Sequence, residues 1–250
     1  MIRRCISVVL RRLGYEIRRL PMDLEPQFHE MYEQVRSYTG VEIARCYSLY
    51  EAARHVVANS VPGAFVECGV YRGGSSMVAA LAFKQLDDLR QLYLYDTFTG
   101  FSEPTERDVS IEGKSARAQW RAGRREDRNE WGYAPLESVK RNMRLTGYPE
   151  DRIIYVPGKV EDTIPDVVPE AISILRLDTD FYESTYHELI HLYPLLQPGG
   201  VLYLDDYGSW MGARQAVDQY FSERPSPILL HRLSGGSRIG VKPQASHAGT

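Results

Sequence analysis

Residues 65–76 read FVECGVYRGGSS, an apolar strand that passes through a glycine-rich turn into the start of a helix. Glycines let a ligand approach the backbone, and the N-terminus of the helix favours an anionic group. The stretch is not a good dinucleotide-binding fingerprint, because the second glycine of G-x-G-x-x-G falls on Tyr71. A tight turn with a purely structural role would give the same pattern, so this stretch alone indicates only a strand, a turn and a helix.

Strands and helices alternate on the C-terminal side of this turn. We expect strands at residues 64–68, 92–96, 152–156, 172–178 and 201–205, and a final pair near 227–233 and 238–242. Helices are expected at residues 27–60, 75–89, 135–147, 184–196 and 211–223, with a weak one after Gly158. This alternation predicts an α/β fold in which helices cover both faces of a mostly parallel sheet.

The length of 250 residues fits one domain, which we place at residues 27–250. Within this domain, residues 97–134 form a long polar stretch with several glycines. A connection of this length inside a compact domain is usually functional, so we expect it to be a lid over a binding site.

Residues 1–26 form a basic N-terminal arm. Six of the first twenty residues are arginine and only Glu16 is acidic, while apolar residues recur at helical spacing. The pattern fits an amphipathic helix that lies peripherally on an anionic membrane through residues 1–20. A helix packed on the domain, or on a second subunit of a homo-oligomer, explains it better. Arginines interrupt the apolar run, which argues against a secretory signal.

The overall composition excludes several classes of protein. The formal net charge is −3, so no global basic field points to nucleic acid. The cysteines Cys5, Cys46 and Cys68 are scattered and form no CxxC pair, which favours a reducing compartment. No apolar run is long enough to span a bilayer. We therefore expect a cytoplasmic protein.

Acidic residues follow or end four of the predicted strands: Glu67, Asp96, Asp178 and the pair Asp205-Asp206. Because parallel strands end at the same edge of a sheet, these carboxylates are expected in one crevice, where ligands of such sheets bind. Carboxylates repel one another, so the cluster needs cations or hydroxyl donors. A divalent metal and a sugar would supply both.

The sequences LDTDFYEST at residues 177–185 and LDDY at residues 204–207 contain the strongest candidates for chemistry. Asp178, Asp205 and Asp206 offer oxygen ligands that suit a hard cation such as Mg²⁺, which can lower the pKa of a bound hydroxyl. Asp180 reaches the same crevice and is the candidate general base. The alternative is a set of solvated loop acids.

The sequence Tyr95-Asp96-Thr97-Phe98 places an acid at the end of the second strand. Such an acid can accept both hydroxyls of an adenosine ribose. The alternative is that Asp96 only caps a turn or helix, since aspartate caps well.

The strings FVECGVYRGGSS, YLYDTFTGF, LRLDTDFYEST, LLQPGGVLYLDDY and AVDQYF occur in this order. Together they closely resemble the TylF/MycF family, the macrocin-type sugar O-methyltransferases of antibiotic pathways, over roughly residues 30 to 242. The resemblance implies a Rossmann-like class I fold dependent on S-adenosylmethionine (SAM), with a mostly parallel seven-stranded sheet. It also implies Mg²⁺ (or Mn²⁺) and methyl transfer to a sugar hydroxyl of a glycosylated natural product or glycan.

The matching positions imply roles for individual residues. Asp178, Asp205 and Asp206 look like the metal ligands and Asp180 like the base. The implied SAM contacts are Glu67, Gly69, Tyr71, Arg72, Gly73, Ser75, Asp96, Thr97, Phe98, Gly158, Glu161, Asp162 and Asp178. The 97–134 segment varies most within the family, so the acceptor sugar and its hydroxyl are left open, as is the choice between an antibiotic and a surface glycan.

Two other functions compete with this interpretation. The sequence His187-Glu188-Leu189-Ile190-His191 matches the H-E-x-x-H motif of zinc peptidases, in which two imidazoles share one helical face. No convincing third ligand follows, because the chain turns at Pro198 and enters a buried strand. Partly exposed histidines on a helix at the flank of the sheet explain the match. The other alternative is a non-catalytic SAM-binding protein. The complete set of acids argues against it, because binding without catalysis does not need them.

Overall fold

The computed structural model describes residues 23–224 and 228–244. The basic amphipathic helix predicted for residues 1–20 lies outside them. Its packing, its membrane contact and the homo-oligomer therefore stay predictions. In the part of the chain that is described, no helix is long and apolar enough to cross a membrane.

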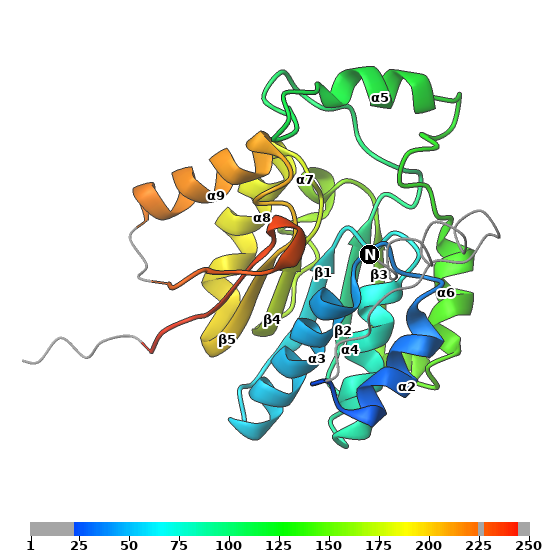
Figure 1. Ribbon diagram of the computed structural model, residues 1–250, viewed down its shortest axis with the longest axis vertical. Coiled ribbons are helices and arrows are strands. Elements are labelled where there is room, and N and C mark those ends of the chain that lie inside the picture. Colours follow the sequence, from blue (N-terminus) through cyan, green and yellow to red (C-terminus); the bar gives the residue numbers. More distant parts are fainter. Residues whose placement is uncertain (1–22, 225–227, 245–250) are drawn as a thin grey trace, which may run out of the picture.

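A seven-stranded sheet forms the centre of the molecule, with the strand order β3-β2-β1-β4-β5-β7-β6 (Figure 1). Strands β1 to β5 are parallel, and β7 runs antiparallel to both β5 and β6. The strands are β1 (Ala64–Cys68), β2 (Leu92–Asp96), β3 (Ile153–Pro157), β4 (Ile172–Leu177), β5 (Leu196–Leu204), β6 (His231–Arg232) and β7 (Arg238–Val241). This arrangement confirms the predicted fold class.

Helices cover the two faces of the sheet, and each face has its own hydrophobic core. The first face is covered by α2 (Pro26–Val35), α3 (Ile43–Ala58), α4 (Gly74–Gln85) and α6 (Leu136–Arg144). The second is covered by α7 (Val160–Thr163), α8 (Tyr182–Leu192) and α9 (Met211–Glu223). Side chains alternate between the two cores along a strand: Phe65 faces the first core and Val66 the second.

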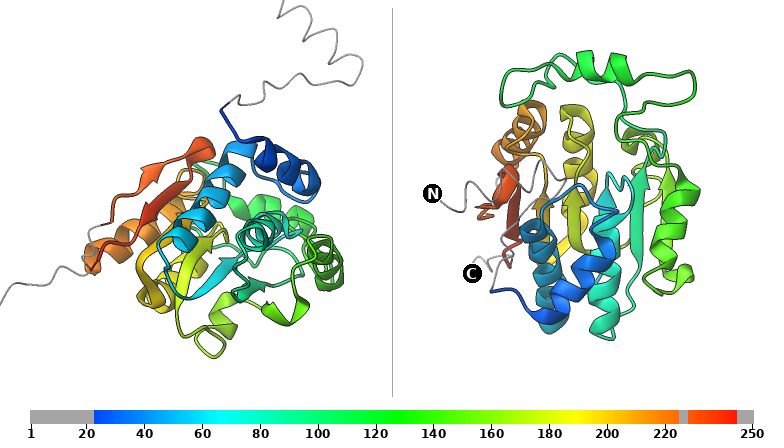
Figure 2. Two further views of the ribbon diagram at one scale, coloured as in Figure 1. Left: turned by 90° about the horizontal axis from the view of Figure 1, so that it is seen from below. Right: turned by 45° about the vertical axis from the view of Figure 1, so that its right-hand side comes forward.

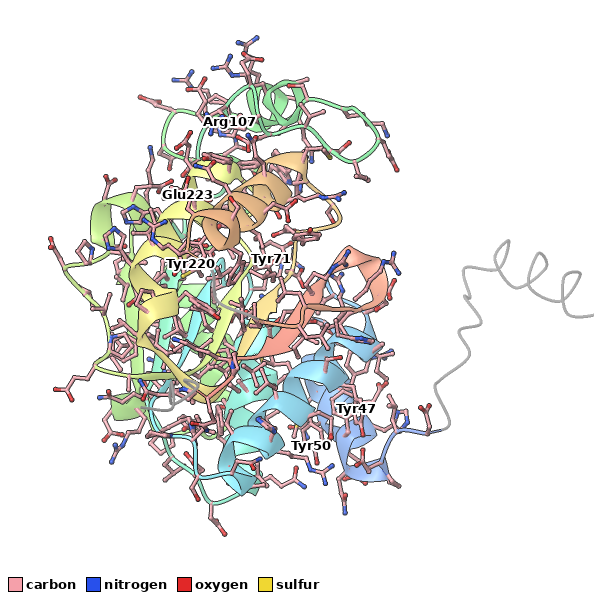
Figure 3. The ribbon with its side chains drawn as sticks, turned by 90° about the vertical axis from the view of Figure 1, so that its left-hand side faces the viewer. Tyr47, Tyr50, Tyr71, Arg107, Tyr220 and Glu223 are labelled. Carbon is pink, nitrogen blue, oxygen red and sulfur yellow. The ribbon has the colours of Figure 1, made fainter. Side chains whose placement is uncertain are left out.

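The helix predicted at residues 27–60 is wrong in one respect, because α2 and α3 are separate helices. The chain between them brings Thr39 against the N-terminus of α4. A side chain on Gly74 would place its Cβ 2.6 Å from the backbone nitrogen of Thr39. Aromatic side chains of α2 and α3 join the two helices: Tyr47 and Tyr50 (Figure 3) both pack on Phe28.

The turn predicted at Pro198–Gly200 is an irregularity inside β5, which begins at Leu196. Ile172 of β4 pairs with Leu196 and Ile174 pairs with Val201, so β5 has extra residues between the two pairs. The predicted lid, residues 97–134, contains a short helix that was not expected, α5 (Ala116–Gly123). This segment arches over the carboxyl ends of the parallel strands (Figure 2).

Candidate active site

A cavity of about 540 Å³ lies at the carboxyl ends of β1, β2, β4 and β5, beneath the 97–134 segment. The predicted site residues in its wall are Glu67, Gly69, Tyr71, Ser75, Asp96, Thr97, Gly158, Glu161, Asp178, Asp180, Asp205 and Asp206. Four other predicted SAM contacts, Arg72, Gly73, Phe98 and Asp162, do not line it. The exposed guanidinium of Arg72 lies over the ring of Tyr71, and Gly73 is the left-handed residue before α4.

The turn after β1 is fixed against the end of β4. Gly69 has a φ of +85°, and a Cβ at this position would lie 2.0 Å from the carbonyl oxygen of Asp178. The backbone N–H of Asp178 donates to the carbonyl of Cys68 at 2.9 Å. Glycine is therefore required at position 69 for conformation and for space, and the turn and the strand end form one unit.

Asp96 organises the backbone on both sides of the cavity wall. Its Oδ2 accepts the N–H groups of Val70 at 2.8 Å and Tyr71 at 2.9 Å, and its Oδ1 accepts that of Phe98 at 2.7 Å. Burial raises the pKa of the Asp96 carboxyl, and these three donors oppose the rise. Asp96 therefore caps this turn, which was the alternative to a role in ribose binding. Asp96 also lines the cavity.

Asp178, Asp205 and Asp206 come together as the sequence predicts. Each offers a carboxylate oxygen, and these atoms lie within 4.8 Å of one another. Burial, together with repulsion by the neighbouring carboxylates, raises the pKa of both Asp178 and Asp206. The pKa of Asp205 is lowered despite burial, because Arg176 and Arg45 stabilise its charged form. A divalent cation fits three hard oxygen donors and would relieve the repulsion at Asp178 and Asp206.

Two arginines that the sequence analysis did not select hold this cluster. Arg176 is 2% exposed, and its Nη1 donates to Glu67 at 2.6 Å and to Asp178 at 2.7 Å. Its Nη2 lies 3.3 Å from Asp205, which also accepts from Arg45 at 2.9 Å. The available signal was the arginine within the otherwise apolar stretch ISILRL of β4.

Asp180 adopts a left-handed conformation, with a φ of 67°. This conformation is unfavourable for a residue with a side chain, and it recurs at functional sites. The backbone N–H of Asp180 donates to Oδ2 of Asp206 at 3.1 Å, which ties the candidate base to a candidate metal ligand. Burial raises the pKa of Asp180 to about 7, so this carboxyl can exchange a proton near neutral pH.

An aromatic cluster adjoins the acids and was not predicted. Phe101 and Trp131 come from the two ends of the 97–134 segment, Phe181 follows Asp180, and Trp210 precedes α9. The ring centroids of Phe101 and Trp131 are 4.5 Å apart, and Phe181 lies 5.3 Å from Phe101 and 5.8 Å from Trp210. All four residues line the cavity. No local sequence pattern indicated them, because they come from segments far apart in the chain.

The segment over the cavity is docked on the core. The backbone N–H of Ile111 donates to Ser209 at 2.9 Å, and that of Met211 donates to Val109 at 2.8 Å. Arg107 (Figure 3) lies in the same segment, with its guanidinium carbon 4.0 Å from the ring centroid of Tyr182 in α8.

The H-E-x-x-H match on α8 does not form a zinc site. His187 Nε2 lies 2.9 Å from the carbonyl oxygen of Ile164, whereas Glu188 is fully buried and accepts from the hydroxyl of Thr179. Both histidines are half-buried at the flank of the sheet. Among the described residues, the only group of three or more possible metal ligands is the aspartate cluster.

Comparison with known proteins agrees with this geometry. The family model of the macrocin O-methyltransferase TylF matches residues 19–229. A tetracenomycin-C rhamnosyl 4'-O-methyltransferase of Streptomyces olivaceus is 35% identical over 74% of this chain and 67% of its own length. Mycinamicin III 3''-O-methyltransferase of Micromonospora griseorubida is 32% identical over 74% of this chain and 70% of its own.

Among solved structures, the O-methyltransferase NovP matches 83% of both chains at 27% identity, with a TM-score of 0.70. Its fold is the class I fold of SAM-dependent methyltransferases, which agrees with the sheet described above. The chain therefore belongs to the TylF macrocin O-methyltransferase family, and it is a SAM-dependent O-methyltransferase.

Proposed function

We propose that this enzyme methylates a sugar hydroxyl of a glycosylated natural product or glycan, with a divalent cation at the aspartate cluster and Asp180 as the general base. One observation carries the proposal: the three clustered aspartates and Asp180 share one cavity with the turn after β1. The relatives named above act on rhamnosyl-tetracenomycin and mycinamicin, which supports a glycoside as the acceptor.

The two ends of the cavity suit different molecules. Gly69, Asp96 and Gly158 line the cavity at the carboxyl ends of β1, β2 and β3, where sheets of this kind bind nucleosides. Asp178, Asp205 and Asp206 would hold Mg²⁺ or Mn²⁺ between this end and the aromatic cluster. The aromatic rings offer flat apolar faces to the C–H face of a sugar, so we place the acceptor against them.

When bound, SAM supplies an electrophilic methyl group, and the cation supplies positive charge beside the acceptor oxygen. A neutral hydroxyl is a poor nucleophile at pH 7, so its proton must leave as the new O–CH₃ bond forms and the S–CH₃ bond breaks, with S-adenosylhomocysteine as the leaving group. Asp180 accepts this proton, and no covalent enzyme intermediate is needed. The docked 97–134 segment excludes water, and the aromatic cluster orients the acceptor oxygen.

Transfer of radiolabelled methyl from SAM to a panel of nitrophenyl pyranosides, rhamnosides included, tests this proposal. Asp180→Asn keeps size and polarity but cannot take a proton, so kcat should fall by about 10²–10⁴-fold. SAM and Mn²⁺ should bind nearly as well as to the wild type. Full activity in chelator would contradict the metal, and a collapse of Mn²⁺ affinity in Asp180→Asn would make Asp180 a ligand rather than the base.

A further inference from the structure

The turn that bears Asp180 is held by contacts from outside the turn. Asp180 lies in the left-handed region, and the N–H of Phe181 closes the turn on the carbonyl of Thr179 at 2.8 Å. Phe181 is the N-cap residue of α8, and its side chain makes no capping hydrogen bond. A turn with an unfavourable residue and no local cap keeps its shape only if its surroundings fix it.

Glu188 supports the turn from behind. It lies two turns into α8, its side chain is 0% exposed, and its Oε1 accepts the hydroxyl of Thr179 at 3.0 Å. The other oxygen, Oε2, is buried and has no hydrogen-bond partner among the described residues. A carboxyl kept in such a place is costly, since an apolar side chain of similar size would avoid the loss of hydration. Its hydrogen bond with Thr179 reaches the residue before the candidate base, and the carboxyl also interacts with the thiol of Cys68 at the end of β1.

Asp108 supports the turn from the front, and it belongs to the 97–134 segment. It is 0% exposed, and its Oδ1 accepts the N–H of Tyr182, the first residue of α8, at 2.9 Å. Its Oδ2 accepts the N–H and the hydroxyl of Thr105 at 2.6 and 3.0 Å. Asp108 therefore caps α8 from 74 residues away in the sequence, in place of the local cap that is missing.

Gly212 shows that this contact needs space. A Cβ on Gly212, in the first turn of α9, would lie 2.2 Å from Oδ1 of Asp108. The first turns of α8 and α9 therefore both surround the Asp108 carboxylate. Docking of the 97–134 segment inserts this carboxylate beside the turn that bears the candidate base.

We propose that Asp108 and Glu188 are positioning residues that fix the Thr179–Tyr182 turn from two sides, so that Asp180 faces the acceptor oxygen. Asp108 makes docking of the 97–134 segment a condition for a correctly placed base. Glu188, the glutamate of the apparent zinc-peptidase motif, has a role in methyl transfer instead. The inference rests on the proposed function in one respect, the assignment of Asp180 as the base.

The contact behind the turn is tested with Glu188→Leu and Thr179→Val, which each remove one partner of the same hydrogen bond. Each should lower kcat about tenfold to a hundredfold through misplacement of Asp180, with KM for the acceptor pyranoside and Kd for SAM nearly unchanged. The double variant should be no worse than Glu188→Leu alone, because that variant already removes the contact with Thr179. Glu188→Gln keeps an acceptor oxygen and should restore most of kcat, while His191→Gln on the same helix is the control.

The contact in front is tested with Asp108→Ala. Here kcat should fall while KM for the acceptor rises, because the 97–134 segment itself is released. Trypsin should cleave the folded variant faster at the exposed arginines Arg121, Arg124 and Arg125, whereas Glu188→Leu should be cleaved at the wild-type rate. Glu112→Gln, which changes an exposed acid of the same segment, is the matched control.

Hydrogen exchange of a peptide that covers residues 179–182 measures the local stability of the turn in the absence of the acceptor substrate. Exchange should be faster in Glu188→Leu, Thr179→Val and Asp108→Ala than in the wild type and both controls. Unchanged exchange, or wild-type kcat in Glu188→Leu and Thr179→Val, would overturn the positioning role. Failure of the proposed function is a different result: Asp180→Asn would keep full kcat whatever the exchange data show.

Discussion

Nη1 of Arg176 lies 2.7 Å from Oδ2 of Asp178, so a candidate metal ligand is already paired with a buried cation. The same guanidinium contacts Glu67 and Asp205, and it thereby compensates acids on three neighbouring strands. Burial alone would make this cluster unstable, because repulsion and lost hydration both oppose ionised carboxylates. Both oxygens of Asp205 are already paired, Oδ2 with Arg45 and Oδ1 with Arg176 and Ser237, so a cation would share this carboxylate with the arginines.

The first prediction concerns this arginine. Arg176→Met removes the shared partner of buried acids, and loss of one partner of a buried ion pair costs about 3–5 kcal/mol. The free energy of unfolding in urea, without divalent cations, should fall by about this amount. Mn²⁺ should restore more stability to the variant than it adds to the wild type. Equal stability of the two proteins would mean that the acids are protonated and need no cation.

The second prediction concerns the metal. Asp206→Asn removes one negative charge from the proposed metal site. Loss of a residue that only supports a metal ligand costs roughly 10- to 100-fold in metal affinity, so the affinity for Mn²⁺ should fall by at least this factor. Methyl transfer should fall steeply and recover in part with excess Mg²⁺ or Mn²⁺. Asp127→Asn, an exposed acid of the 97–134 segment, serves as the control. Electron paramagnetic resonance of Mn²⁺ gives the affinity, and an unchanged value would remove Asp206 from the ligand set.

The third prediction concerns Asp96. Asp96→Ala removes the acceptor of the N–H groups of Val70, Tyr71 and Phe98, and also the carboxylate that we predict to bind the cofactor ribose. Binding of SAM should weaken by about 1.5–3 kcal/mol in calorimetry. The unfolding free energy should also fall, since buried N–H groups lose their partner. Weaker folding with unchanged SAM affinity would show that Asp96 acts only as a turn cap.

The fourth prediction concerns the aromatic cluster. Trp131→Leu and Trp210→Leu keep apolar side chains but remove the flat rings, so KM for the acceptor pyranoside should rise about threefold to tenfold. Kd for SAM should not change. Ile111→Ala is the control, because Ile111 is an exposed apolar residue of the same segment and does not line the cavity. If KM stays at the wild-type value in both leucine variants, the rings serve only to dock the segment.

The fifth prediction concerns pH. Burial raises the pKa of Glu188 well above its ordinary value of 4.5, so the folded protein favours the neutral carboxyl. A raised folded-state pKa adds stability that is fully present below the unfolded pKa and is lost as pH rises toward the folded pKa. Glu188→Gln cannot ionise. Urea unfolding should therefore show the wild type losing stability relative to this variant from pH 4.5 upward, and a constant difference would place an ionised carboxylate at this site.

The fold was predictable because its signals are local. Strands such as Ala64–Cys68 and Leu92–Asp96 are short apolar runs between turn residues, and their ends matched the structure. The clustering of the acids at the strand ends could be predicted from the sequence, since parallel strands end at one edge of the sheet. The break between α2 and α3 had a local signal in Gly40 that the prediction of one helix overlooked, whereas the approach of Thr39 to Gly74 joins residues distant in sequence.

The remaining parts of the site depend on tertiary contacts. Trp131 and Trp210 meet across segments that no periodicity links, and Arg45 reaches Asp205 from a helix at the other end of the chain. Arg176 had a visible signal, a charge inside an apolar strand. The partners that make this charge tolerable become apparent only when the strands are laid side by side.

The contact of Gly69 with the carbonyl of Asp178 has a consequence for redesign of the enzyme. The turn after β1 and the end of β4, where we place the nucleoside and the cation, meet at a backbone-to-backbone contact. A side chain at position 69 would therefore displace the end of β4 and disturb both parts of the site together. Substitutions that change the acceptor therefore belong elsewhere, in the 97–134 segment and the loop before α9. There aromatic side chains line the cavity, and each can be replaced separately.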